Sequence, residues 1–348
     1  MKSFCCEACG WSVYFENSEC LNCGSRLAYV PDTSQIRPLR PAGADLWQSK
    51  TKLNYRLCRN YTEYNVCNWS VPVADSTAYC ISCRLNRTIP DLSVPGNQIA
   101  WAKFESAKRR LNYTLLNLGL AIRSKAEDPS SGLFYEFKAD LPGAPVVTGH
   151  ADGVITINLA EADDAERERR RLALGEPYRT ILGHFRHEIG HYYWDRFFRD
   201  GRKLQEFRSV FGDERADYAA ALKSHYQNGA PSGWGEAFIS AYATSHPWED
   251  WAETWAHYLH MTDVLETAAG AAVSVAPPET GQRAVAISES GSFGQMVEAW
   301  FPLTYLLNNL NRSLGLPDAY PLVLSPKVIK KLEFVHETIA ENRGRATA

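Results

Sequence analysis

One short segment carries the residue types that hold a catalytic zinc ion, His187-Glu-Ile-Gly-His191. If the segment is helical, the two histidines lie one turn apart on one face, so both imidazoles can reach a single zinc ion. Glu188 then projects beside them, where it can act as the general base toward a zinc-activated water. This pattern predicts zinc-dependent hydrolysis, and it requires a third zinc ligand elsewhere in the chain.

The third ligand is expected from a second helix, which the sequence predicts from Pro247 onward. Glu249 and Glu253 lie one turn apart on that helix, so Glu249 can bind zinc while Glu253 fixes the second ring nitrogen of a ligand histidine. Bulky apolar residues surround both carboxylates, which indicates a buried position. Glu214 remains an alternative third ligand, because it lies closer to the first motif along the chain. It stands in the acidic first turn of a helix predicted over residues 213–222, where it can also simply complement the helix N-terminus.

The elements that must position these residues follow from local patterns. The first motif lies in a helix predicted over residues 177–198, where Pro177 suits the first turn and Gly190 leaves room for a neighbouring element. Residues 154–159 have the β-branched enrichment of a strand, and we expect them to form the edge of a small sheet. An edge strand of this kind can pair with an extended peptide backbone.

Other helices are predicted from apolar spacing and caps over residues 101–120, 161–174, 293–310 and from Ser325 onward. The first of them carries the basic triplet Lys108-Arg-Arg110 off its apolar face. No wider basic field surrounds the triplet, so we expect a solvated face rather than a nucleic-acid site.

All nine cysteines lie between Cys5 and Cys83. Two Cys-x-x-Cys pairs have the spacing that closes around one tetrahedral zinc: Cys6, Cys9, Cys20 and Cys23. A second set is spaced less regularly and predicts a second zinc: Cys58, Cys67, Cys80 and Cys83. A site of four thiolates leaves no position for water, so both zinc ions would be structural. Disulfides and buried free thiols are the alternatives, and a reducing compartment argues against the disulfides.

This uneven distribution of cysteines predicts a division of the chain into three parts. Residues 1–30 would form a zinc ribbon, and residues 31–95 a second four-cysteine zinc-binding module, with the proline-rich stretch over residues 31–41 as a linker. Residues 96–348 would form the catalytic domain with C-terminal helices. The predicted fold class is α+β, a mostly helical zincin-like metallopeptidase domain preceded by small β-rich zinc-ribbon modules.

Composition limits the other possible roles. The chain has 37 Lys and Arg against 40 Asp and Glu, so it lacks the strongly basic field of a dedicated nucleic-acid binder. It opens without the apolar stretch of a signal peptide, and no segment reaches the roughly 18–20 apolar residues that span a membrane. We therefore expect a cytoplasmic protein that does not bind membranes.

Three segments resemble the bacterial putative zinc-binding metallopeptidase family with an N-terminal zinc ribbon: residues 83–91, 183–194 and 247–257. The resemblance extends to about Thr267, and it implies a reaction class without a substrate. More distantly, the segment Glu249-Asp-Trp-Ala-Glu253 is similar to the Glu-x-x-Ala-Glu element of gluzincins such as anthrax lethal factor, in which the first glutamate binds zinc. Those enzymes carry a tyrosine seven residues earlier that stabilises the developing oxyanion, and Tyr242 occupies that position here.

The residues and the resemblance together predict a zinc metallopeptidase that acts on a peptide or protein substrate. One catalytic zinc would be held by His187, His191 and Glu249, with two structural zinc ions on the cysteines. One alternative is a zinc-ribbon adaptor that binds a protein or nucleic acid and carries a silent peptidase-like domain. Another is a zinc amidase that acts on a small substrate. The sequence does not predict the oligomeric state or the cleavage specificity.

Overall fold

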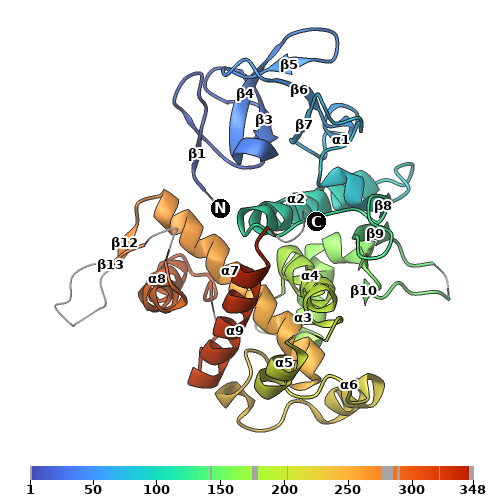
Figure 1. Ribbon diagram of the computed structural model, residues 1–348, viewed down its shortest axis with the longest axis vertical. Helices are drawn as coiled ribbons and strands as arrows, with labels where there is room; N and C mark the ends of the chain where they lie inside the picture. Colours follow the sequence, from blue (N-terminus) through green and yellow to red (C-terminus); the bar gives the residue numbers. More distant parts are fainter. Residues whose placement is uncertain are drawn as a thin grey trace. The chain divides into compact units, whose positions relative to one another are not determined.

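The computed structural model describes residues 2–141, 143–174, 179–201, 203–275, 285–287, 291–320 and 322–344. The chain divides into two compact units, Ser3–Glu166 and Arg167–Ala346. The first unit holds most of the strands and the second is mainly helical (Figure 1). The predicted α+β fold class, with β-rich modules before a helical domain, is confirmed.

The cysteine-rich region is built from short strands. A hairpin pairs β1 (Phe4–Cys5) with β2 (Ser12–Val13). A five-stranded sheet follows in the order β3 (Arg26–Val30), β4 (Gln35–Pro41), β5 (Trp47–Gln48), β6 (Asn54–Leu57) and β7 (Ser70–Pro72). A bridge between Tyr29 and Trp69 brings β3 beside β7, so the sheet curls on itself. Short helical turns complete the region: η1 (Pro31–Thr33), α1 (Arg59–Thr62) and η2 (Cys83–Leu85).

The predicted linker over residues 31–41 is wrong, because most of this stretch forms β4. Proline is tolerated in a strand where no ladder hydrogen bond is lost. The neighbouring β5 pairs only with Arg40 and Pro41, so Pro38 lies in a part of β4 that has a single partner strand. Pro38 and Pro41 are therefore part of a strand and do not mark a linker between two modules.

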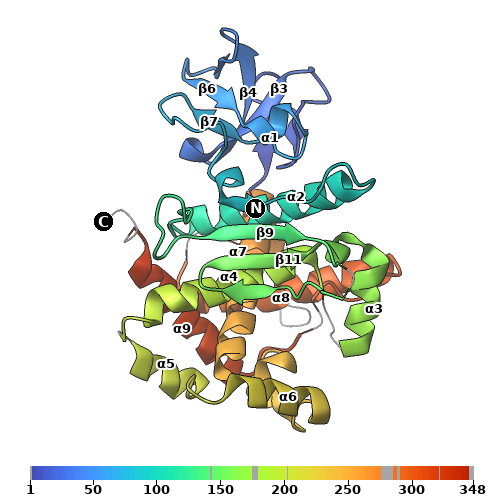
Figure 2. The same cartoon turned by 90° about the vertical axis from the view of Figure 1, so that its right-hand side faces the viewer.

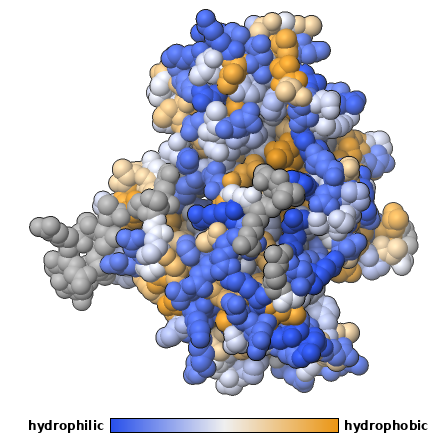
Figure 3. All heavy atoms as spheres, viewed as in Figure 1, coloured by the Kyte–Doolittle hydropathy of each residue, from blue (hydrophilic) through white to orange (hydrophobic). Residues whose placement is uncertain are grey.

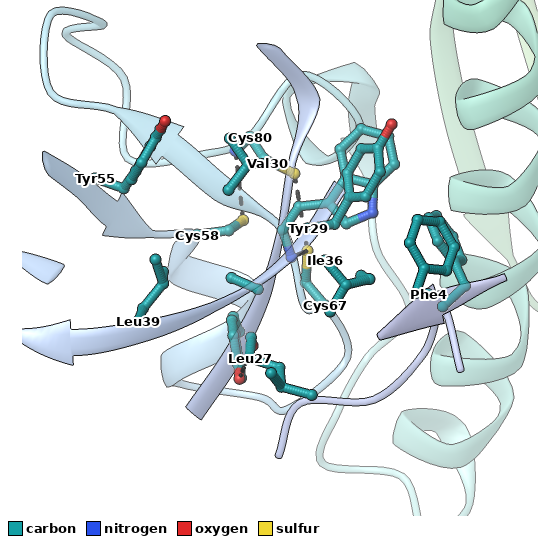
Figure 4. Packing of buried hydrophobic residues seen from close by; sticks show 14 of the residues in the cluster. Phe4, Leu27, Tyr29, Val30, Ile36, Leu39, Tyr55, Cys58, Cys67 and Cys80 are labelled. Carbon is teal, nitrogen blue, oxygen red and sulfur yellow. Dashed lines mark hydrogen bonds between the residues drawn. The ribbon is translucent and has the colours of Figure 1, made fainter. Parts of the chain in front are cut away.

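One hydrophobic core runs through the whole cysteine-rich region (Figure 4). It contains Cys6 and Cys20 from the first cysteine set together with buried cysteines of the second set, and strand residues such as Leu27. Tyr113, from the helix α2 (Asn97–Asn117), belongs to the same core. The core thus crosses residue 30 and extends past residue 95, and the three-part division of the chain stays a prediction about independent folding.

Helix α2 packs on a four-stranded sheet in the order β10 (Gly149–Ala151), β11 (Val154–Asn158), β9 (Phe134–Lys138) and β8 (Asn86–Thr88) (Figure 2). Phe104 of the helix stacks on Phe137 of β9, with 5.6 Å between ring centroids. The prediction that residues 154–159 form the sheet edge is wrong, because β11 lies between β9 and β10. Asp152 and Gly153 both have positive φ and form a tight turn, which folds β10 back onto β11.

The basic triplet on α2 is mostly buried, which corrects the expectation of a solvated face. Lys108 is fully buried and forms an ion pair of 2.7 Å with the equally buried Glu105. Arg109 is buried and donates to the backbone carbonyl of Val66. Only Arg110 is partly exposed, so the cysteine-rich region and α2 are joined by buried charge as well as by apolar contacts.

The second unit is organised around α7. Its helices are α4 (Ile181–Phe198), α5 (Leu204–Phe211), α6 (Tyr218–Asn228), α7 (Pro247–Gly270), α8 (Phe293–Ser313) and α9 (Pro326–Asn342). The first unit ends after η3 (Leu159–Ala162), and α3 (Asp164–Leu174) spans the boundary between the two units. Shorter elements are η4 (Trp234–Glu236), η5 (Tyr242–Thr244), β12 (Ser274–Val275) and β13 (Val285–Ala286). Helix α7 contacts α4, α5, α8 and α9, and its buried Trp251 lies among the rings of Phe198, Phe207 and Phe334.

The helix starts at Pro247 and Ser325 follow the predicted signals, and others differ. Helix α7 begins at Pro247, and Ser325 caps α9, both as predicted. Helix α4 begins at Ile181, where the Thr180 hydroxyl accepts a hydrogen bond from the Gly183 amide; the predicted start at Pro177 lies outside the described residues. The helix predicted over residues 213–222 begins only at Tyr218, because Asp217 caps it.

Helices α4 and α7 touch at Gly190, as the sequence predicts. A Cβ atom at this position would lie 3.1 Å from Cα of Ala252 and 3.2 Å from Cδ1 of Trp255. The indole of Trp251 donates to the Gly190 carbonyl over 2.9 Å. The glycine therefore allows the two helices that carry the predicted zinc ligands to pack in direct contact.

The surface visible in Figure 3 mixes polar and apolar residues. The face shown in Figure 3 is mostly hydrophilic, with apolar residues in separate patches. Within the described part of the chain, no helix is long and apolar enough to cross a bilayer.

Candidate metal centres

Among the described residues, ligand-type side chains gather in three groups whose ligand atoms all lie within 4.8 Å of one another. They are the groups predicted from spacing: Cys6, Cys9, Cys20 and Cys23; Cys58, Cys67, Cys80 and Cys83; and His187, His191 and Glu249. Folding thus brings each predicted ligand set together.

The histidine and glutamate group has the spacing of a zinc coordination shell. Nε2 of His187 lies 3.2 Å from Nε2 of His191 and 3.0 Å from Oε2 of Glu249. Nε2 of His191 lies 3.4 Å from the same carboxylate oxygen. Ligands bound tetrahedrally at zinc distances are about 3.3–3.6 Å apart, so these three atoms suit one zinc ion.

The electrostatics of this group favour a positive charge at its centre. Glu249 is 1% exposed, and its Oε2 is buried without a well-oriented hydrogen bond. Burial alone would raise the pKa of Glu249, but the imidazoles of His191 and His187 lower it well below its usual range. Burial alone would lower the pKa of His187, yet the carboxylates of Glu249 and Glu253 raise it well above its usual value. A zinc ion would supply a positive charge that balances the negative charge of Glu249 and Glu253.

Glu253 contacts the first ligand histidine from behind. Its Oε1 lies 2.7 Å from Nδ1 of His187, and its Oε2 accepts a hydrogen bond of 2.6 Å from the Ser240 hydroxyl. Although burial would raise the pKa of Glu253, the contact with His187 outweighs it and lowers that pKa to about 2. An ionised Glu253 accepts a hydrogen bond from Nδ1–H of His187, which leaves Nε2 as the ring nitrogen that can bind a metal.

The two predicted catalytic side chains, Glu188 and Tyr242, lie on different elements. Glu188 follows His187 on α4 and is 9% exposed. The ring of Tyr242, on η5, lies 5.9 Å from the His187 ring between centroids. Burial and the negative charge of Glu249 raise the pKa of Tyr242, so its hydroxyl stays protonated and can donate.

Glu214, the alternative third ligand, is engaged elsewhere. Its Oε2 accepts a hydrogen bond of 2.9 Å from Nε of Arg208 on α5. This guanidinium holds the pKa of Glu214 below its usual value. The structure therefore brings Glu249, and not Glu214, to His187 and His191.

Two contacts at the site have no signal in the sequence. The hydroxyl of Tyr218 donates to Oε1 of Glu249 over 2.6 Å, and Ser240 holds Glu253. Neither residue stands at a helical or turn spacing from the carboxylate that it contacts, because each lies on a different element. Only the path of the chain between α4 and α7 places them there.

The cysteine groups have a wider spacing that suits sulfur. The Sγ atoms of Cys6 and Cys23 are 3.8 Å apart, those of Cys9 and Cys20 are 3.6 Å apart, and those of Cys67 and Cys80 are 3.8 Å apart. Four thiolates at about 2.3 Å from a tetrahedral zinc are about 3.8 Å from one another. The second group is wholly buried, whereas Cys9 and Cys23 of the first group are exposed.

Comparison with known proteins identifies the family. The sequence model described as "Putative zinc-binding metallo-peptidase" matches residues 97–338. The chain belongs to this metallopeptidase family. A zinc-ribbon domain matches residues 3–94 ahead of the metallopeptidase region. Both findings confirm the family resemblance, and they support zinc as the metal that this chain binds.

Relatives of this family member occur in mycobacteria. Three proteins described as uncharacterized, one from Mycobacterium bovis and two from Mycobacterium tuberculosis strains, are each 41% identical to it over 342 residues. The matches cover 98% of this chain and 96% of each relative, so the zinc-ribbon and metallopeptidase regions occur together in all of them. No solved structure gives a significant match.

Proposed function

We propose that this family member is an active zinc metallopeptidase that hydrolyses peptide bonds in a peptide or protein. His187, His191 and Glu249 would hold the zinc ion. The observation that supports this proposal is the set of three ligand atoms, 3.0–3.4 Å apart, on two helices in direct contact. Three protein ligands are the number found in catalytic zinc sites, which keep one position for water or substrate.

Glu188, Glu253 and Tyr242 would each have a separate role in this hydrolysis. When bound, zinc lowers the pKa of a water molecule to about 7 and polarises the scissile carbonyl. Glu188 takes the proton from the attacking water and passes it to the leaving amine. Glu253 would keep His187 in the tautomer that binds metal through Nε2, because its Oε1 accepts a hydrogen bond of 2.7 Å from Nδ1 of His187. Tyr242, a half-buried phenol beside His187, would donate a hydrogen bond to the developing oxyanion.

The cysteine groups would hold two structural zinc ions, on the same argument of ligand spacing and number. Four thiolates complete a tetrahedral shell and leave no position for water. We therefore expect about three zinc ions per chain, of which one is catalytic.

Glu188→Gln in the zinc-loaded chain tests the function. A general base contributes about 10²–10⁴-fold, so we expect this variant to keep its zinc and to lose at least 100-fold in kcat on a broad peptide library. His187→Ala is the matched control, and it should lose both one zinc ion and the activity. Zinc per chain is measured by elemental analysis on the same samples.

Three results would contradict the proposal, each in a different way. Undiminished hydrolysis by Glu188→Gln would remove the general base from the mechanism. Cleavage of small amides without cleavage of any peptide would identify a zinc amidase. A zinc-loaded wild type that cleaves nothing but binds a protein partner would favour the adaptor function.

A further inference from the structure

Tyr218 is the only described side chain outside the ligand set for which the structure records a hydrogen bond to Glu249. Its hydroxyl donates to Oε1 over 2.6 Å, the length of a charge-assisted bond between a hydroxyl and a carboxylate. The contacts to the two histidines are made by the other oxygen, Oε2, at 3.0 and 3.4 Å. The two oxygens of Glu249 therefore have different partners.

Apolar burial does not explain why Tyr218 lies at the site. It is the first residue of α6, a helix that has no buried residue, and it is itself 38% exposed. Its ring contacts the rings of His246 and Trp248, with centroids 5.2 and 5.7 Å away. Trp248 in turn lies 3.8 Å from the ring of His191. Tyr218 thus contacts the ligand Glu249 directly through its hydroxyl. Its ring also packs on Trp248, which contacts the ligand His191.

We infer that Tyr218 is a positioning residue for the metal: it holds Oε1 of Glu249 so that the carboxylate binds zinc through Oε2 alone. A carboxylate that binds through one oxygen keeps the coordination number low, and this leaves room for water or substrate. The inference rests on the proposed zinc site, but not on peptide hydrolysis. It goes beyond the ligand set because no spacing in the sequence connects Tyr218 with Glu249.

Tyr218→Phe in the full-length chain is the direct test, since it removes the hydroxyl and keeps the ring. Loss of a group that orients a metal ligand typically weakens metal binding 10–100-fold, and we expect about tenfold for this partly exposed residue. Zinc affinity of the His/Glu site is measured by competition with a chromophoric chelator. Tyr226→Phe is the matched control, because it removes an exposed hydroxyl from the same helix and should leave the affinity unchanged.

Cobalt in the same site reports the coordination number. Zinc is first removed from the His/Glu site, while elemental analysis verifies that the cysteine sites keep theirs, and Co²⁺ is then added. Four-coordinate cobalt absorbs visible light several times more strongly than five-coordinate cobalt. We expect a weaker band in Tyr218→Phe than in wild type, because Oε1 is then free to bind as well.

Tyr218→Ala separates the hydroxyl from the ring. Equal losses of affinity in Tyr218→Phe and Tyr218→Ala would assign the effect to the hydroxyl and support the inference. An unchanged affinity and cobalt spectrum in Tyr218→Phe, or a loss only in Tyr218→Ala, would overturn it. Neither measurement uses a peptide, so a protein that binds zinc here but cleaves nothing would refute the proposed function and leave this inference intact.

Discussion

The cysteine-rich region and the His/Glu site both gather metal ligands at zinc spacing, but they do so by different means. In the cysteine-rich region the strands are two to seven residues long, and several cysteines belong to the hydrophobic core itself. In the His/Glu site the ligands lie on helices of 18 and 24 residues that pack through tryptophan and phenylalanine rings. The His/Glu site is thus held by the packing of aromatic side chains between two helices. In the cysteine-rich region, by contrast, candidate metal ligands are themselves part of the hydrophobic core.

This difference indicates whether a metal would contribute mainly to stability or mainly to chemistry in each region. Six of the candidate ligand cysteines lie in the hydrophobic core of the cysteine-rich region, and small zinc modules commonly depend on the metal for folding. We expect the long helices to fold without a metal, because buried aromatic rings pack between them. Zinc in the cysteine groups should therefore matter for stability, and zinc in the His/Glu site for chemistry.

The largest expected effect is the loss of a buried cysteine. Cys67→Ser removes one ligand from the wholly buried second group, and we expect the loss of one zinc ion per chain and of several kcal/mol of unfolding free energy. Elemental analysis and thermal unfolding measure the two effects. Cys5→Ser is the control, because Cys5 is exposed and outside both groups. A variant with full zinc content and a wild-type Tm would abolish the contrast between the two regions.

A smaller effect is expected behind the His/Glu site. Glu253→Gln removes the charge that orients His187, so zinc binding at that site should weaken about 10–100-fold while the chain stays folded. Competition with a chelator measures the affinity, and circular dichroism measures the fold. Glu333→Gln, an exposed change on α9, is the control. Global unfolding of Glu253→Gln would show that this site also depends on its polar groups for folding.

The smallest effect is expected where the two ligand helices meet. Gly190→Ala places a Cβ 3.1 Å from Cα of Ala252, and such overpacking costs about 1–3 kcal/mol, partly offset by the better helix propensity of alanine. We expect a modest fall in Tm with zinc content unchanged. Gly294→Ala is the control, since its Cβ would meet nothing closer than 3.8 Å. A Tm equal to that of wild type would mean that the helix contact can relax at little cost.

Local spacing in the sequence was sufficient to propose the two histidines and the Cys-x-x-Cys pairs as metal ligands. Cys-x-x-Cys pairs and the His-x-x-x-His spacing place ligands together through a turn or a helical period, which depends only on nearby residues. The helix starts at Pro247 and Ser325 were predictable for the same reason, since capping is a local interaction.

Where the prediction failed, the outcome depended on distant segments. The strand over residues 154–159 is not an edge, because residues 149–151 fold back onto it. Lys108 and Arg109 are buried because Glu105 and the Val66 carbonyl meet them inside the first unit. Charge in the sequence alone indicates exposure, and only a specific partner reverses that expectation.

The family, the α+β class and the residues that are able to bind metal were all predictable from the sequence. Tertiary structure alone brought Glu249 rather than Glu214 to the histidines, and it alone placed Tyr218 and Ser240 against the site. The physical reason is the range of the interactions. Turns and helical periods are set by neighbours in sequence, whereas the approach of two helices is set by how their buried side chains pack.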